Sequence, residues 1–365
     1  MSTKSRKPFI FVNHDDKIDA LSFSQIASFL RCRKQWEYNY LQKLSPRVEH
    51  HSLTIGKLAH ICMAAYWRTK AYNGNKPTSE NWGIDAIRTA VVDSMVIMED
   101  GDPLEQDFYE EISSQAEEVY LRALRAFQPD GWEVMFAPAR EGAGPLVEVR
   151  FAIPAVMKTP IQGYIDLVAR EISTGAVWQI DWKFVSAFSD PDGEMFNMQN
   201  ALYQYALKRA GVPVVGSITF LTLNKASTLP KLNKNGTVSR ALIRTTWEQY
   251  AEFVRANGGD PEDYREEMQP KLAGIEWVSD IREYRNAETL DAIWKTEYIG
   301  TAYEILSKKT RHPRNVSLMT CRMCQYRSLC HAELRGYDAE YVRGEEYQNR
   351  AEPIPVASSE DSDDA

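Results

Sequence analysis

The 365-residue sequence has no apolar stretch approaching the length of about 18 residues that a membrane-spanning helix requires. Its first residues, MSTKSRKPFIFVNHDD, lack the apolar segment of a secretory signal peptide. Cysteine is also scarce, with five residues in the chain, which excludes a disulfide-rich secreted domain. We therefore expect a cytoplasmic protein with reduced thiols and no membrane partner.

Basic residues are outnumbered, and the formal net charge is −8. Five of the acidic residues lie in the segment 351–365, which has no basic residue, so the remainder of the chain is close to neutral. A near-neutral protein can still carry a local basic groove, because steering depends on the local field. The charge therefore does not exclude a polyanionic partner, and a hydrophobic content of 44% allows a large core.

Four of the five cysteines are divided between the two ends of the chain. Cys32 stands alone, whereas Cys321, Cys324 and Cys330 form a C-x2-C-x5-C cluster. Metal–sulfur bonds could offset the entropy of closing a loop of about 290 residues, so we expect the two ends to meet. The scattered spacing favours a four-cysteine iron–sulfur cluster over zinc, which prefers two short pairs, and reduced cysteines without metal remain a third interpretation. Cys62 lies in an apolar helical run and is expected to pack in the core.

Hydrophobic periodicity divides the chain into a helical first third and a mixed remainder. Helical spacing extends over 22–42, with Ser22 or Ser24 as N-cap, and over about 53–72, 83–99 and 103–127. The next segments are β-rich runs at 146–153, 161–170 and 176–185, a helix at 195–210, a strand at 214–223, a polar loop at 224–240, and helices at about 246–257 and 280–307. Three strands, a helix and a strand predict a mixed sheet with at least one crossover.

Two of the predicted strands carry acidic residues. Asp166 lies in the second strand, and Asp181 and Lys183 lie in the third, on one face because side chains alternate. A hairpin around Gly175 would bring Asp166 near Asp181. Carboxylates suit Mg²⁺ or Mn²⁺, and Lys183 could orient a water or stabilise charge on a phosphate. A solvent-facing ion pair is the alternative, but the apolar opposite face of the strand favours a site.

Other candidate residues are less specific when taken singly. His60 follows Gly56 by one turn on a mostly apolar helix, where a hydrogen-bonded core histidine is commoner than a metal ligand. Gln199 and Tyr203 share a helix face at i and i+4, which is also the pattern of an ordinary surface. Glu148 in the first strand is either an additional acid of the site or a surface residue.

Taken together, these residues form six motifs in order. They are Ser-x-Ser-x-x-x-x-Phe-Leu-x-Cys, Gly-x-x-x-His, Gly-x-x-Asp, Asp-x-Lys, Gln-x-x-x-Tyr and C-x2-C-x5-C. This order resembles the RecB-like branch of the PD-(D/E)XK nucleases. Within that branch it is most similar to the iron–sulfur nucleases, such as the AddB nuclease domain and the CRISPR-associated adaptation exonucleases. The resemblance spans residues 22–335.

The resemblance implies roles for the candidate residues. His60, Asp166 and Asp181 would bind Mg²⁺ or Mn²⁺, Lys183 would position the nucleophile, Gln199 and Tyr203 would align substrate or lysine, and Cys32, Cys321, Cys324 and Cys330 would hold a [4Fe–4S] cluster. Two features depart from the family pattern. Phe184 follows the lysine where threonine is usual, and Tyr164 and Leu167 flank Asp166 where charged residues are common, which affects contacts with DNA rather than the metal site.

The implied fold is α/β, with a mixed central sheet of restriction-endonuclease-like type and an iron–sulfur clasp joining the N- and C-terminal segments. The expected regions are an N-terminal extension (1–20), a helical region contributing Cys32 and His60 (21–137), a nuclease core (138–260), a C-terminal helical region with the cysteine cluster (261–345), and a disordered acidic tail (346–365).

The implied function is a metal-dependent DNA exonuclease of recombination or repair, encoded by a phage or mobile element and acting on single-stranded DNA or duplex ends. No G-x-x-x-x-G-K-[ST] phosphate-binding loop is present, so any motor would be a separate helicase or recombinase. The alternatives are an inactive iron–sulfur protein that binds DNA ends and a zinc-stapled structural subunit of a larger helicase–nuclease complex.

Overall fold

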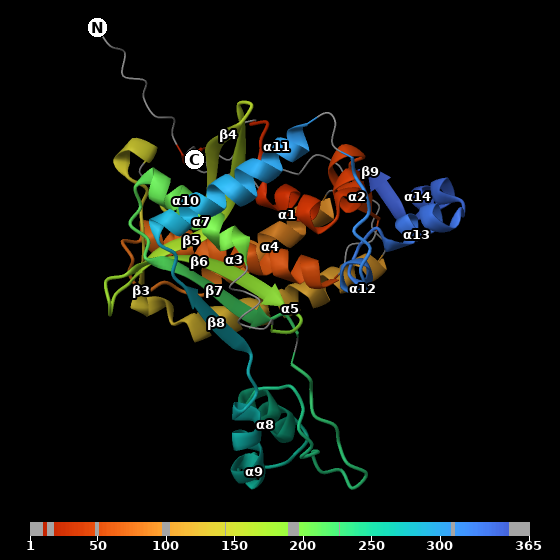
Figure 1. The fold of residues 1–365 in the computed structure, drawn as a ribbon. Helices are drawn as coiled ribbons and strands as arrows, with labels where there is room; N and C mark the ends of the chain where they lie inside the picture. The colour runs from red at the N-terminus through yellow and green to blue at the C-terminus, as the bar shows by residue number, and fades with distance from the viewer. Residues whose placement is uncertain are drawn as a thin grey trace.

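The computed structural model describes residues 10–12, 18–47, 51–96, 103–142, 144–188, 197–225, 227–307 and 311–349. A mixed β-sheet lies between two layers of helices (Figure 1). Its strand order is β1-β5-β6-β7-β8, and β3 and β4 also pair with β5. The strands are β1 (Leu21–Ser22), β3 (Trp132–Val134), β4 (Val147–Val156), β5 (Thr159–Glu171), β6 (Val177–Val185), β7 (Gly216–Leu223) and β8 (Val278–Glu283).

The centre of the sheet confirms the predicted mixed topology. β5 and β6 form an antiparallel hairpin that turns at Gly175, whose φ of +72° suits glycine. β6 and β7 pair in parallel, from Trp178 with Gly216 to Val185 with Leu223. The crossover between them runs through α7 (Met198–Ala210). Parallel neighbours require such a crossover, so the sequence order of strand, helix and strand determines this pairing.

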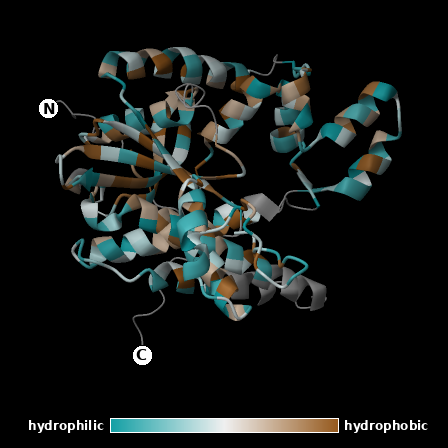
Figure 2. Cartoon of the chain, turned by 90° about the horizontal axis from the view of Figure 1, so that it is seen from below, coloured by the Kyte–Doolittle hydropathy of each residue, from teal (hydrophilic) through white to brown (hydrophobic). Residues whose placement is uncertain are grey.

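Each face of the sheet has its own helical layer. One layer consists of α3 (His51–Tyr72), α4 (Asn81–Val96) and α5 (Pro103–Phe127), and the other of α1 (Phe23–Arg31), α7, α10 (Ala287–Ile293), the π-helix η4 (Trp294–Ile299) and α11 (Gly300–Leu306). Short 3-10 turns occupy Pro129–Gly131 and Ala139–Glu141. Hydrophobic residues gather on the strands and the helix faces that cover them (Figure 2). Trp182 of β6 stacks on Trp67 of α3, so the apolar face of this strand fixes α3 in place.

Some predicted elements are wrong in detail. The helix expected over 22–42 is interrupted, because Cys32 is extended with φ −162°, and α2 (Arg33–Trp36) and a π-helix, η1 (Glu37–Leu41), follow it. Residues 278–283 form β8 on the edge of the sheet, where a helix was expected from about 280. β1, β3 and β8 lie outside residues 138–260, so the sheet also draws strands from the adjoining regions.

The N- and C-terminal segments meet, as the cysteine arrangement predicted. β2 (Leu44–Pro46) pairs with β9 (Tyr347–Asn349), and a small core joins Tyr38, Tyr326 and Tyr347. The C-terminal helices are α12 (Leu318–Arg322), α13 (Arg327–Arg335) and α14 (Ala339–Glu346). The tail expected to be disordered from residue 346 therefore begins with an ordered strand, and residues 350–365 lie outside the described part.

Between β7 and β8, residues 224–277 form an insertion that extends away from the sheet (Figure 1). It contains α8 (Trp247–Ala256) and α9 (Glu262–Ala273), and the sequence pattern missed the second of these helices. Across the described residues, no helix combines the length and apolar character needed to cross a membrane.

Candidate active site

The site begins where β5 and β6 separate. Their ladder ends at Leu167 paired with Ile180, and two residues farther along β6 the backbone amide of Trp182 donates to Asp166 Oδ2 at 2.8 Å. The Asp166 carboxylate thus takes the place of the backbone carbonyl that would accept this hydrogen bond in a continuous ladder. The same register sets Asp166 opposite Asp181. Asp181 is 1% exposed; its Oδ2 lies 2.7 Å from the Lys183 ammonium, and its Oδ1 accepts no hydrogen bond from the described residues. A buried carboxylate with an unsatisfied oxygen is costly, so this gap in the sheet favours a further cation.

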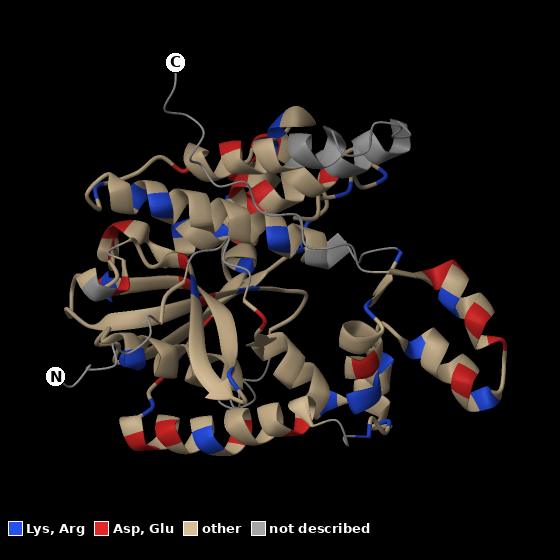
Figure 3. Cartoon of the chain, turned by 90° about the horizontal axis from the view of Figure 1, so that it is seen from above, with Lys and Arg blue, Asp and Glu red and all other residues tan. Residues whose placement is uncertain are grey.

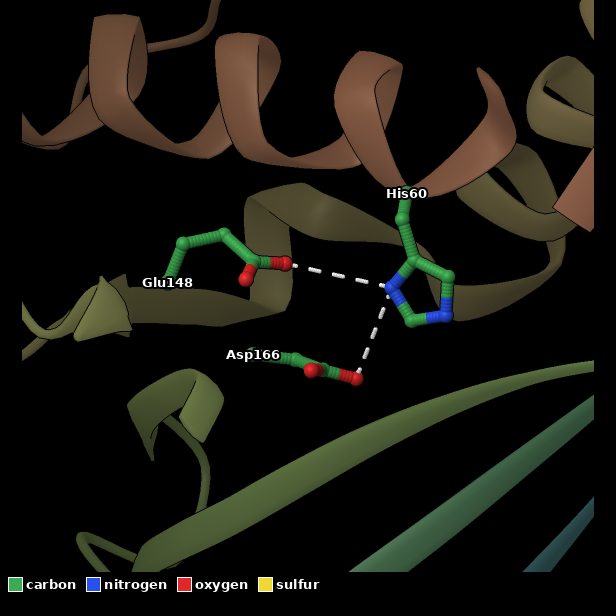
Figure 4. Close-up of side chains that lie close together, drawn as sticks. All are labelled: His60, Glu148 and Asp166. Carbon is green, nitrogen blue, oxygen red and sulfur yellow. Dashed lines mark ion pairs between the residues drawn. The ribbon is translucent and has the colours of Figure 1, made fainter. Parts of the chain in front are cut away.

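Three side chains from separate elements converge on this gap (Figure 4). His60 of α3 has its Nδ1 3.8 Å from Glu148 Oε1 of β4 and 3.7 Å from Asp166 Oδ2 of β5. One ligand atom from each of the three lies within 4.8 Å of the other two. Carboxylate oxygens with one imidazole nitrogen form a donor set that suits Mg²⁺ or Mn²⁺. His60 is therefore not a buried core histidine, the commoner alternative for such a helix.

Glu148 is the residue whose role sequence reasoning left open. In the β4–β5 register it lies between Val147, paired with Leu167, and Val149, paired with Ile165, directly across from Asp166. Its φ is +47°, a left-handed conformation unfavourable for glutamate. Strained backbone persists where the surrounding structure enforces it, often at functional sites. The only hint in the sequence is an acid inside the apolar run LVEVRF.

The electrostatics of the site indicate an excess of negative charge. Burial raises the pKa of Asp166 to about 7, with Glu148 and Asp181 adding to the effect and His60 opposing it. Burial lowers the pKa of His60, but Asp166, Glu148 and Asp181 outweigh it and raise that pKa to about 9. Because both pKa values are raised, Asp166 and His60 retain protons that balance the negative charge of the carboxylates. A divalent cation can replace those protons.

A second set of contacts holds Lys183 beside these acids. Its Nζ lies 2.7 Å from Asp181 Oδ2, as their shared strand face requires, and donates to Gln199 Oε1 at 3.0 Å. Gln199 Nε2 in turn donates to the Tyr203 hydroxyl at 2.7 Å. Asn197 caps the N-terminus of α7 by accepting from Gln199 N, which fixes the first turn of the helix. The i and i+4 residues on α7 therefore form a relay that orients the lysine.

Gly163 explains part of the Gly-x-x-Asp motif. A Cβ at this position would lie 2.8 Å from the Phe151 ring and 2.9 Å from the Tyr203 ring. Glycine thus allows Tyr203 to approach β5 closely. Phe184, one of the departures from the family pattern, packs edge-on against His60 with ring centroids 5.2 Å apart, so it positions the imidazole.

The cysteines lie at the junction of the two chain ends. Asn315 N donates to Cys32 Sγ at 3.4 Å, and Arg314 Nε donates to Cys330 Sγ at 3.2 Å. Burial raises the pKa of the Cys324 thiol, and Cys32, Cys330 and Cys321 raise it further. Cys32, Cys321 and Cys330 therefore lie near enough to Cys324 to affect its ionisation.

Their sulfurs do not form a compact group. Among the described residues, no three cysteine sulfurs lie within 4.8 Å of one another. Cys62 is separate, as expected, because it is fully buried and donates to Leu58 O at 2.9 Å.

Comparison with known proteins identifies the family. No curated protein matches the chain. The sequence profile of the PD-(D/E)XK nuclease superfamily matches residues 20–331, from the residue before β1 into α13. This match contains every element that contributes to the metal site and the lysine relay. The chain therefore belongs to the PD-(D/E)XK nuclease superfamily.

Proposed function

We propose that this protein is a metal-dependent DNA exonuclease of the RecB-like iron–sulfur branch, acting on single-stranded DNA or on duplex ends. The observation that supports it best is the convergence of His60, Glu148, Asp166 and Asp181 beside Lys183. Nucleases of this superfamily use divalent metals, and His60, Glu148 and Asp166 bring one ligand atom each within 4.8 Å of the other two.

The residues of the site divide into two groups. His60, Glu148, Asp166 and Asp181 would hold Mg²⁺ or Mn²⁺, which when bound polarises the scissile phosphate and lowers the pKa of water. Lys183 holds its ammonium beside Asp181, where it can hydrogen-bond an attacking water or a phosphate oxygen.

The Gln199 and Tyr203 relay restrains the lysine on its other side. Burial raises the pKa of the Tyr203 hydroxyl well above its ordinary value, so that group stays protonated and neutral. The relay therefore orients Lys183 without adding negative charge to the site.

We also propose that Cys32, Cys321, Cys324 and Cys330 hold a [4Fe–4S] cluster. Each cysteine of such a cluster binds a different iron, so its sulfurs are farther apart than those around a single ion. The hydrogen bonds from Asn315 N to Cys32 and from Arg314 to Cys330 are of the kind that stabilise cluster sulfurs. The cluster would tie the two chain ends together beside the nuclease core. A separate helicase or recombinase would supply DNA strands in recombination or repair.

The test is an assay with end-labelled single-stranded and duplex DNA, and with circular single-stranded DNA, in Mg²⁺ or Mn²⁺. We expect mononucleotides or short products from linear DNA and none from circles. Asp181→Ala should abolish cleavage while retaining its fold by circular dichroism. Cleavage by folded Asp181→Ala would contradict this assignment of the site. Binding of DNA ends without cleavage by the wild type would instead support an inactive end-binding subunit.

A further inference from the structure

The insertion between β7 and β8, residues 224–277, is here called the arm. It has a small core of its own, formed by Tyr250, Val254, Tyr264 and Met268 with Val238. This core packs α8 and α9 against the extended segment 225–246, so the segment has a defined position. The active site described above uses no residue of the arm.

Charge is segregated within the arm. The extended segment 225–246 has five basic residues and no acidic one, whereas residues 247–277 have eight acidic and three basic residues. On the two C-terminal helices α13 and α14, by contrast, acidic and basic residues alternate (Figure 3). An ordinary solvated surface intersperses the two signs. The segregation therefore marks one side of the arm as a cationic surface.

Most of these cations are available to a ligand. Arg240 is not, because it pairs with Glu267 and donates to Asp263 O, which anchors the segment to α9. The remaining basic residues are exposed, and none forms an ion pair with any described residue: Lys225, Lys231, Lys234 and Arg244.

The tip of the segment is a tight turn that presents two of these lysines. Leu232 forms an isolated antiparallel β-bridge with Val238, and Asn233 N donates to Thr237 O at 2.8 Å. Gly236 allows the turn with φ of +83°. Lys231 lies just before this turn and Lys234 lies within it. Leu232 at the tip and Leu242 farther along are 49% and 67% exposed, so apolar surface alternates with the cations.

The arm leaves the sheet at the catalytic end. Lys183 of β6 pairs in register with Leu221 of β7, and β7 ends two residues later. Asn224, the first residue of the arm, donates its backbone N–H to Val185 O at 2.9 Å. The basic segment therefore begins beside the strand end that carries Asp181 and Lys183.

We propose that the basic segment 225–246 of the arm binds the phosphodiester backbone of the DNA strand that enters or leaves the nuclease site. This deepens the proposed nuclease function and rests on it. A cationic surface attracts phosphates, and exposed leucines among the basic residues can contact bases that are not stacked in a duplex. The acidic helices behind the segment repel the strand and confine it to one side.

The binding test uses the Asp181→Ala protein, so that no cleavage interferes, and measures fluorescence anisotropy of a labelled strand at several salt concentrations. Lys231→Gln with Lys234→Gln should weaken binding and reduce the slope of log affinity against log salt by about 1.4 for a single strand. The matched control replaces Lys76 and Lys295, two exposed lysines away from the arm, with Gln. A hairpin duplex of equal length shows whether the segment prefers a single strand or a duplex. An unchanged slope and affinity in the arm variant would overturn the proposal.

A cleavage test in the active protein separates this proposal from the proposed function. The arm variant should lower kcat/KM more for a strand of about 30 nucleotides than for one of about 4, because a short strand cannot span both site and arm. Equal losses for both lengths would contradict strand binding by the arm. If wild type does not cleave but the arm variant still loses salt-dependent binding, the nuclease function fails and the arm remains a DNA-binding element.

Discussion

Replacing Glu148 with Gln tests whether this strained residue is a metal ligand. The change keeps the shape of the side chain and removes its charge. Two unit charges about 4 Å apart interact by about 4 kcal/mol at the effective dielectric of a partly exposed site. The cost of dehydrating the carboxylate offsets part of this. We therefore expect the variant to bind Mn²⁺ about 100-fold more weakly, a loss of about 2.8 kcal/mol.

Calorimetric titration of Mn²⁺ into wild type and variant measures this loss directly. Glu252→Gln, on the exposed surface of α8, is the matched control and should bind Mn²⁺ as wild type does. Thermal unfolding in a chelator shows whether Glu148→Gln retains its fold. Equal Mn²⁺ affinity in a folded Glu148→Gln protein would refute the reasoning, and the positive φ would then be a purely structural strain.

Three further predictions concern the lysine relay, the cysteines and a buried charge. Lys183→Ala should lower kcat by at least about 100-fold and Gln199→Ala by about 10-fold in single-turnover assays, because the first removes the ammonium and the second only its orientation. Equal effects would contradict the relay. In anaerobically purified protein, Cys32→Ala should lose the absorbance at about 400 nm and become sensitive to protease within residues 311–335. Cys62→Ala should keep both the absorbance and the protease resistance. Retention of the absorbance by Cys32→Ala would exclude that ligand. Lys70 is 1% exposed, and burial lowers its pKa. Just below pH 10.5 the folded state therefore binds fewer protons than the unfolded state, and the free energy of unfolding rises with pH there. Lys70→Met should increase the free energy of unfolding at pH 7 by about 1 kcal/mol or more and remove that rise, as denaturant titrations at several pH values would show.

Local patterns in the sequence were sufficient for much of the fold. The hairpin from β5 to β6 follows from period-two runs on either side of Gly175, and the crossover through α7 follows from strand, helix and strand in order. The common face of Asp181 and Lys183 also follows from strand alternation alone. These features depend on neighbours within a few residues, which a sequence displays directly.

Other features could not be read from local patterns. Residues 280–283 looked helical but complete an edge strand, because β7 offers an unpaired edge that the chain returns to after the arm. The break at Cys32 is another case, since an otherwise continuous amphipathic pattern is interrupted at a residue whose sulfur meets Asn315. In both places, tertiary contacts override the helical preference of the segment.

The site itself shows where sequence ends and tertiary structure begins. The sequence alone determined which chemical groups are available, and their order along the chain was enough to indicate a nuclease family. Tertiary structure decided that Glu148 joins them, because its role depends on the β4–β5 register and on a left-handed backbone that glutamate adopts only under constraint. It also decided that His60 faces the acids, because the packing of Trp67 on Trp182 sets the position of α3 over the sheet. Such convergence depends on contacts between residues far apart in the chain, and no local pattern encodes them.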